Sequence, residues 1–197
     1  MEEQYPPRRL SRLSPQAGLR HPPQPPELVH LDSPALAVMT SFDRVWPVTV
    51  APEMSIDAAL DRMKRAGVRL LLVIGPEGEI AGLVSAEDLM GERPIRISEE
   101  QRIPRAQITV QQVMLPAGEV RVLDLRSVRD AQVGHILATL DALGRQHVLV
   151  VEHDAPTGAQ TVVGLFSRTH IAKRMLREEW HSLRAAPSLA AMLRSTD

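Results

Sequence analysis

Most of this 197-residue chain carries the same ordered landmarks twice, and this internal repeat constrains the fold more than any other feature. The first copy runs from Val38 to Met90 and the second from Val113 to Met175. In each copy a Val-Met pair precedes an amphipathic stretch that ends at a glycine, and a Gly-hydrophobic-X-Ser sequence follows. A repeat of this size predicts two similar supersecondary units that pack on each other. Two such units also create two related clefts.

Each copy predicts the order helix, short strand, helix, strand, strand, helix. The main helix carries apolar residues at positions i, i+3, i+4 and i+7, which indicates one buried face: Ile56, Ala59, Leu60 and Met63 in the first copy, and Val133, Ile136, Leu137 and Leu140 in the second. Both helices are expected to stop at a glycine, as C-terminal capping favours. The nearly continuous aliphatic strands that follow predict a sheet covered on both faces.

The repeat divides the chain into five segments. We expect a proline-rich, extended or disordered arm over residues 1–32, because residues 1–34 hold eight of the sixteen prolines and proline lacks an amide donor. The first repeat is expected over 33–92, a polar linker over 93–108, the second repeat over 109–176 and a helical tail over 177–197. An apolar stripe near the tail can pack on a partner or on the module itself; its members are Ala172, Leu176, Trp180 and Leu183.

Composition and charge exclude several classes of protein. The net charge is −1 and the basic residues are scattered, so we expect neither nucleic acid nor an anionic membrane as a partner. The chain has no cysteine, which removes disulfides and thiolate metal sites and fits the cytoplasm as its location. No apolar segment follows the acidic start, so no secretory signal is expected. The longest aliphatic run, Leu70 to Ile74, is too short to cross a bilayer.

Enzyme motifs are absent from the sequence. It contains no Gly-X-Ser-X-Gly elbow, no phosphate-binding loop and no His-Glu-X-X-His pair, and its seven histidines are dispersed. We therefore expect a protein that is not an enzyme, with no metal site and no required cofactor.

Four motifs carry a resemblance to a known family. They are Val38-Met39-Thr40 at the entry, Pro47-Val48-Thr49-Val50 at the first short strand, Ser55-Ile56-Asp57-Ala58-Ala59 at the helix start, and Gly82-Leu83-Val84-Ser85-Ala86-Glu87-Asp88. Together they resemble the CBS domain, named after cystathionine β-synthase, arranged as a tandem pair, and the last matches the family's Gly-hydrophobic-X-Thr/Ser-X-X-Asp signature. The resemblance implies an α/β (α+β) fold of two pseudo-two-fold-related units, each a small three-stranded sheet with flanking helices. It also implies a homodimer, and an adenosine-containing ligand that regulates an attached or partner protein.

The first copy supplies the candidate ribose site. A carboxylate can accept hydrogen bonds from two neighbouring hydroxyls, so Asp88 suits a ribose and Ser85 adds a hydroxyl one turn earlier. The resemblance implies that Thr49 lines the same pocket and that Arg69 lies near its wall. An alternative stays open, because Ser-X-X-Asp before a helix is also the pattern of a capping box.

The second copy departs from the family pattern. His170 stands where the family keeps aspartate, and a neutral imidazole has one acceptor nitrogen, so it cannot hold a diol as a carboxylate does. Ser167, Arg168 and His170 are instead candidate phosphate contacts for a ligand held by the first copy, or simply part of a solvated basic helix. His147 begins a strand and is expected to pack against the sheet.

Two functions remain. The leading hypothesis is a regulatory module that binds AMP, ADP, ATP or S-adenosylmethionine in the cleft between the repeats. The alternative is a structural or protein-interaction pair of the same fold that binds no ligand. The sequence does not name the ligand or the regulated protein.

Overall fold

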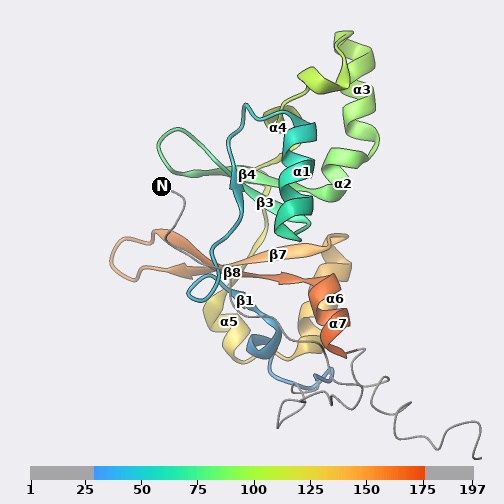
Figure 1. Ribbon diagram of the computed structural model, residues 1–197. Coiled ribbons are helices and arrows are strands. Elements are labelled where there is room, and N and C mark those ends of the chain that lie inside the picture. The colour runs from blue at the N-terminus through green and yellow to red at the C-terminus, as the bar shows by residue number, and fades with distance from the viewer. Residues whose placement is uncertain (1–28, 176–197) are drawn as a thin grey trace, which may run out of the picture.

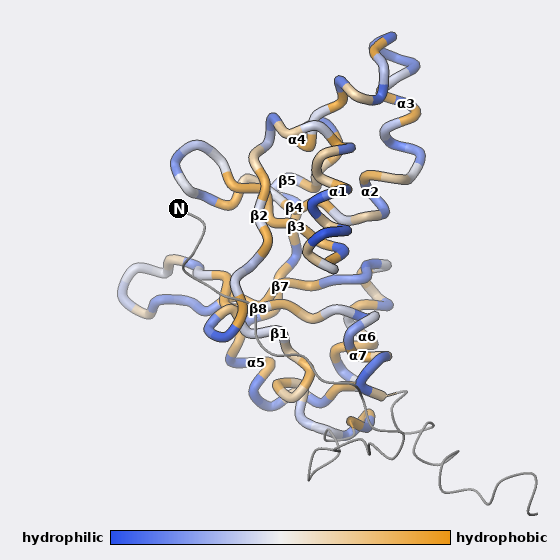
Figure 2. The backbone as a smooth tube through the Cα atoms, in the orientation of Figure 1, coloured by the Kyte–Doolittle hydropathy of each residue, from blue (hydrophilic) through white to orange (hydrophobic). Residues whose placement is uncertain are grey.

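The computed structural model describes residues 29–175, so residues 1–28 of the predicted arm and the whole predicted tail lie outside it. The described chain forms two units, one above the other in Figure 1, and each is a four-stranded sheet with helices. The central strands of both sheets are coloured largely as hydrophobic in Figure 2. The predicted α/β architecture of two related units is confirmed.

The two units share one order of elements, and the second unit has one additional helix, α5. The first unit comprises β2 (Thr49–Val50), α1 (Ile56–Ala66), β3 (Leu70–Ile74), β4 (Ile80–Ser85) and α2 (Ala86–Met90). The second comprises β6 (Val122–Asp124), α5 (Leu125–Arg129), α6 (Val133–Leu143), β7 (His147–His153), β8 (Gln160–Ser167) and α7 (Arg168–Met175). In both, the first strand runs parallel to the next and the last two form an antiparallel hairpin.

The fourth strand of each sheet comes from the other repeat. The 3-10 helix η1 (Ala35–Val38) leads into β1 (Thr40–Ser41), which pairs with β8. Likewise α4 (Val110–Val113) leads into β5 (Leu115–Pro116), which pairs with β4. The sheet orders are therefore β2-β3-β4-β5 and β1-β8-β7-β6, with four strands where the resemblance implied three. A two-residue strand has no periodicity that a sequence pattern can reveal.

Three apolar layers hold the units together. The first core joins sheet and helices of the first unit and also contains Ile97 and Val113 from beyond that repeat. The second core contains Val29, from the end of the predicted arm, and Val38, from the entry segment of the first repeat. A third cluster, centred on Leu70, Leu72 and Leu149, lies between the two sheets. The sheets are thus covered on both faces, as their aliphatic sequence predicted.

The main helices follow their predicted stripes. Helix α1 buries Ile56, Ala59 and Met63, and α6 buries Val133, Ile136 and Leu140. Each ends at a glycine in the left-handed region, Gly67 at φ 66° and Gly144 at φ 59°. At that φ a side chain would strain the backbone, so the capping role predicted for the two glycines is confirmed.

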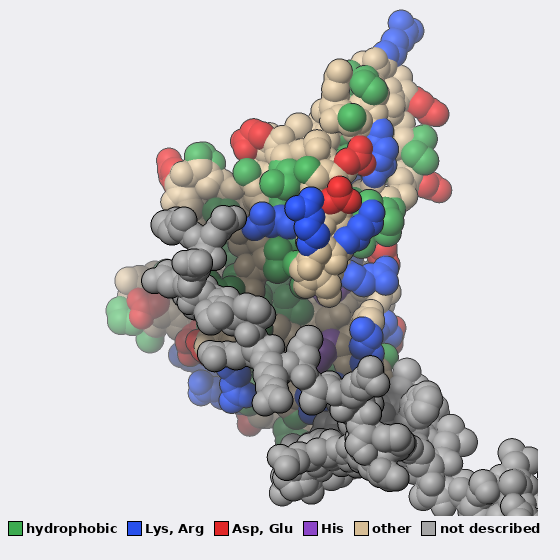
Figure 3. Space-filling view, viewed as in Figure 1, with side chains coloured by type: hydrophobic (Ala, Val, Ile, Leu, Met, Phe, Trp, Pro, Cys, Tyr) green, Lys and Arg blue, Asp and Glu red, His purple; other side chains and the backbone are tan. Residues whose placement is uncertain are grey.

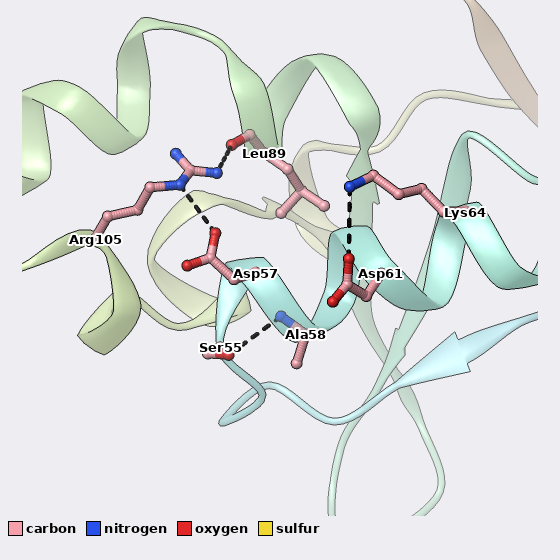
Figure 4. Close-up of polar contacts among 7 residues, drawn as sticks. All are labelled: Ser55, Asp57, Ala58, Asp61, Lys64, Leu89 and Arg105. Atoms are coloured by element: carbon pink, nitrogen blue, oxygen red, sulfur yellow. Dashed lines mark hydrogen bonds and ion pairs between the residues drawn. The ribbon is translucent and has the colours of Figure 1, made fainter.

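The predicted linker is largely helical and lies against the first unit. It contains α3 (Glu92–Gln101) and the 3-10 helix η2 (Arg105–Gln107). Arg105 donates through Nε to the Asp57 carboxylate at 2.9 Å and through Nη2 to the Leu89 carbonyl at 2.8 Å, which ties this segment to α1 and α2 (Figure 4). The same view shows Ser55 capping α1 through the backbone N–H of Ala58. The sequence predicted a linker here because most side chains of α3 are polar and exposed, and only Pro94 and Ile97 are buried.

The signature glycines leave room for the exchanged strands. A Cβ on Gly164 would lie 2.6 Å from the Thr40 carbonyl oxygen of β1, and a Cβ on Gly82 would collide with the Leu115 carbonyl of β5. We expect Gly164→Ala to lower the free energy of unfolding by about 1–3 kcal/mol, as overpacking does. Urea denaturation measures this.

Gly118→Ala is the matched control, because nothing lies within 4 Å of a Cβ built there. Its effect is expected to stay within about 0.5 kcal/mol. Equal effects of the two substitutions would contradict a steric role for Gly164.

Candidate functional site

A cavity of about 380 Å³ lies where the two units meet. Its first-unit wall comes from β3, β4 and the start of α2, and its second-unit wall from the segment before β6, the end of α6 and the start of β7. Leucine and valine side chains form the apolar part of the lining. The polar and charged lining residues are Ser85, Glu87, Asp88, Glu119, Arg121, Arg145, Gln146 and His147.

Ser85 and Asp88 form a capping box at the start of α2. One carboxylate oxygen of Asp88, Oδ2, accepts from the Ser85 backbone N–H at 2.7 Å and from the Ser85 hydroxyl at 2.6 Å. In return the Asp88 backbone N–H donates to the Ser85 hydroxyl oxygen at 3.2 Å. The capping alternative raised by the sequence is therefore confirmed, and both residues also line the cavity.

The second carboxylate oxygen of Asp88 faces the other unit. Asp88 Oδ1 lies 4.0 Å from Nη1 of Arg145, and the two side chains are 20% and 49% exposed. The backbone of Arg145 is fixed just after α6, because its N–H donates to the Leu140 carbonyl at 3.1 Å. This is the hydrogen bond that closes a helix C-terminus around a left-handed glycine, here Gly144.

His147 stands in the cavity wall as the first residue of β7. It pairs with Ser167, just as Leu70 pairs with Ser85 in the first unit, so the imidazole takes the place of a leucine. Burial, together with the charge of Arg69, lowers the pKa of His147 to about 4, and the charge of Asp88 opposes this shift. At neutral pH the ring is therefore uncharged and offers one donor and one acceptor.

Thr49 and Arg69, the two other predicted pocket residues, do not line this cavity. Thr49 pairs with Leu72 as Val122 pairs with Leu149, so it corresponds to Val122. The Arg69 carbonyl accepts from Ala86 as the Gln146 carbonyl accepts from Arg168, so Arg69 corresponds to Gln146. By pseudo-symmetry Arg69 therefore takes the place at the related junction that Gln146 takes in the cavity. Val122, the counterpart of Thr49, does not line the cavity and packs against the cluster between the two sheets.

The predicted phosphate contacts of the second copy also stand apart from the cavity. Arg168 forms an ion pair with Asp141, and Ser167 ends β8 opposite His147. His170 is exposed on α7 by its surface area, yet partial desolvation of the ring, together with the charges of Arg174 and Lys173, lowers its pKa. None of Ser167, Arg168 and His170 is among the residues that line the cavity.

The cavity contains charges of both signs. Three carboxylates, on Glu87, Asp88 and Glu119, face two guanidinium groups, on Arg121 and Arg145. The sequence did not predict either arginine as a site residue. Arg121 precedes β6 and Arg145 follows α6, and both belong to the second repeat, which lacks the family aspartate. On the face shown in Figure 3, other basic side chains gather over α1.

Two further properties concern residues 29–175 only. No group of three or more histidine, aspartate or glutamate side chains could hold a metal ion there. In the same region, no helix is both long and apolar enough to cross a membrane.

The depressed pKa of His147 makes stability depend on pH. Between pH 6.5 and about 4 the unfolded chain binds a proton that the folded chain rejects, so stability falls as the pH falls through this window. We expect wild type to lose up to about 2 kcal/mol more than His147→Leu between pH 7.5 and 5. Urea unfolding at both pH values measures this, and parallel losses would contradict it. Leucine is the residue at the equivalent position in the first unit.

Comparison with known proteins agrees with this architecture. Residues 35–94 match the family model of the CBS domain. No curated protein matches the sequence. Among solved structures, an uncharacterized conserved protein from Pyrococcus horikoshii has a TM-score of 0.52 at 20% identity, over 74% of this chain and 93% of that one.

Two further structures have a TM-score of 0.50. A CBS-domain containing protein from Agrobacterium tumefaciens is 18% identical over 70% of this chain and 93% of its own. CBSX2 of Arabidopsis thaliana, in complex with AMP, is 20% identical over 75% of this chain and 98% of its own. At these identities the likeness shows the fold. The CBS domain model thus matches the first repeat, and the described chain has the fold of these CBS-domain structures.

Proposed function

We propose that the cavity between the two units binds an adenosine-containing ligand, and that the chain is a regulatory module rather than an enzyme. The observation that carries this proposal is that the two carboxylate oxygens of Asp88 have different surroundings. Asp88 Oδ2 caps α2, while Oδ1 faces the cavity with no hydrogen-bond donor from residues 29–175. A ribose hydroxyl is the kind of donor that such an oxygen accepts.

The remaining lining suits the other parts of a nucleotide. Leu83, Val148 and Leu149 offer an apolar wall for a base, and the neutral His147 offers one donor and one acceptor beside it. Arg121 and Arg145 supply cationic groups for a phosphate. The solved structure of CBSX2 with AMP, a protein of the same fold, supports this ligand class. AMP, ADP, ATP and S-adenosylmethionine are the ligands to test.

Replacement of Asp88 tests the carboxylate directly. We expect Asp88→Ala to weaken binding of the adenosine ligand by several-fold to about a hundredfold, or roughly 1–3 kcal/mol for a lost charge-assisted hydrogen bond. Isothermal titration calorimetry with the four ligands measures the change.

Asp88→Asn separates binding from capping. The amide oxygen of Gln112 accepts from the Thr109 backbone N–H at 2.8 Å in the capping box of α4, so an amide can cap here too. Asp88→Asn is therefore expected to keep the stability that Asp88→Ala loses, and still to bind ligand weakly. Wild-type affinity in both variants, or no binding of any ligand by wild type at millimolar concentration, would sink the proposal.

A protein-interaction role is the second candidate, favoured by the exposed apolar side chains of Met90 and Ile95 on α2 and α3, 55% and 58% exposed. We also propose that the chain forms a homodimer in the cytoplasm and acts on a separate protein, as the family resemblance implies. Light scattering on the purified protein is expected to give twice the mass of one chain. A monomer at micromolar concentration would contradict the dimer and leave the ligand site unaffected.

A further inference from the structure

We propose that Arg145 makes the cavity selective for phosphorylated adenosine over the unphosphorylated nucleoside. Its guanidinium forms a cross-unit latch with Asp88 that a ribose must displace, and a phosphate on the same ligand gives it a new partner. This inference rests on the proposed function, because it concerns how that site chooses among its ligands.

The hydrogen bonds of Asp88 direct a ribose toward the latch. Oδ2 already accepts two hydrogen bonds from Ser85, at 2.7 and 2.6 Å. Within the described residues, the only ion-pair partner of Oδ1 is Arg145 Nη1, at 4.0 Å. A sugar hydroxyl that approaches this carboxylate therefore competes with the guanidinium for the same oxygen.

Arg145 can change partner without any change in the fold. Its backbone is held by the bond to the Leu140 carbonyl, whereas its side chain is 49% exposed and so retains rotamer freedom. Its side chain lines the same cavity as Asp88. A rotation of the side chain alone can thus carry the charge from the carboxylate to a ligand.

The latch exists at one of the two related junctions. The Val68 N–H donates to the Met63 carbonyl as the Arg145 N–H donates to that of Leu140, so valine stands at the equivalent position. The residue equivalent to Asp88 is His170, in the Gly-hydrophobic-X-Ser-X-X position of the second copy. At the other junction, valine and histidine therefore replace the arginine and aspartate of this ion pair.

The charge of the ligand then decides the balance. A nucleoside that displaces Arg145 gives the guanidinium no anion in return, so the ion pair opposes binding. A nucleotide brings a phosphate, to which a guanidinium can donate two parallel hydrogen bonds. Removal of the guanidinium should consequently help one ligand and harm the other.

Opposite changes in affinity are the signature of the latch. In the full-length chain, we expect Arg145→Met to bind adenosine about two- to fivefold more tightly, since exposed ion pairs are weak. The same variant is expected to bind AMP about tenfold or more weakly, since it loses a charge-assisted phosphate contact. Calorimetric titration of each ligand gives both dissociation constants.

Arg121→Met is the matched control. Arg121 lines the same cavity but forms no ion pair with any residue in the range 29–175, so its removal is expected to weaken AMP without strengthening adenosine. Arg145→Gln is a second test of the latch, since it removes the charge and keeps a polar group, and it should reproduce both signs.

The outcomes separate the two proposals. Binding of AMP by wild type, combined with changes of the same sign for both ligands or with no change in the Arg145 variants, would overturn the latch and leave the site in place. Failure of wild type to bind either ligand would overturn the proposed function, and the latch with it.

Discussion

The close approach of two exchanged strands to two glycines is the contact on which the structure depends. Gly82 and Gly164 lie at equivalent positions in β4 and β8, and each faces a backbone carbonyl of the other repeat's entry strand. Because no Cβ intervenes, β5 and β1 can hydrogen-bond to these strands and complete the sheets. The signature glycine is thus explained by backbone packing. The exchange also fixes how the units face each other, and therefore where a cavity can form.

The serine and aspartate of the same signature cap a helix, and both line the cavity that we propose as the ligand site. A capping box satisfies the first amides of α2 with one hydroxyl and one carboxylate oxygen, and the remaining oxygen is presented to the junction. A capping role and the proposed binding role are compatible, because they use different oxygen atoms of one carboxylate. The helix cap holds the carboxylate in one orientation, which lowers the entropic cost of ordering this side chain when a ligand binds.

The sequence predicted those structural features that depend on residues close together along the chain. The stripes of α1 and α6, the stop at Gly67 and Gly144, and the cap at Ser85 each depend on residues within one or two helical turns. The two-residue strands β1 and β5 and the mostly exposed helix α3 carry no such pattern. Arg121 and Arg145 reach the cavity through tertiary packing, about 30 and 60 residues from Asp88 along the chain. The pairing of β2 with β3 places Thr49 beside Leu72 and outside the cavity lining, which only the three-dimensional arrangement reveals.

The exchange of entry strands makes neither repeat a self-sufficient folding unit. A fragment that ends before β5 would leave the backbone groups of β4 unpaired along an open sheet edge, and an isolated second repeat would leave β8 in the same state. Open edges of this kind promote association between chains. Protein fragments that contain a single repeat should accordingly associate with the complementary fragment or aggregate. During synthesis, the sheet of the amino-terminal repeat can be completed only after β5 of the second repeat has been made.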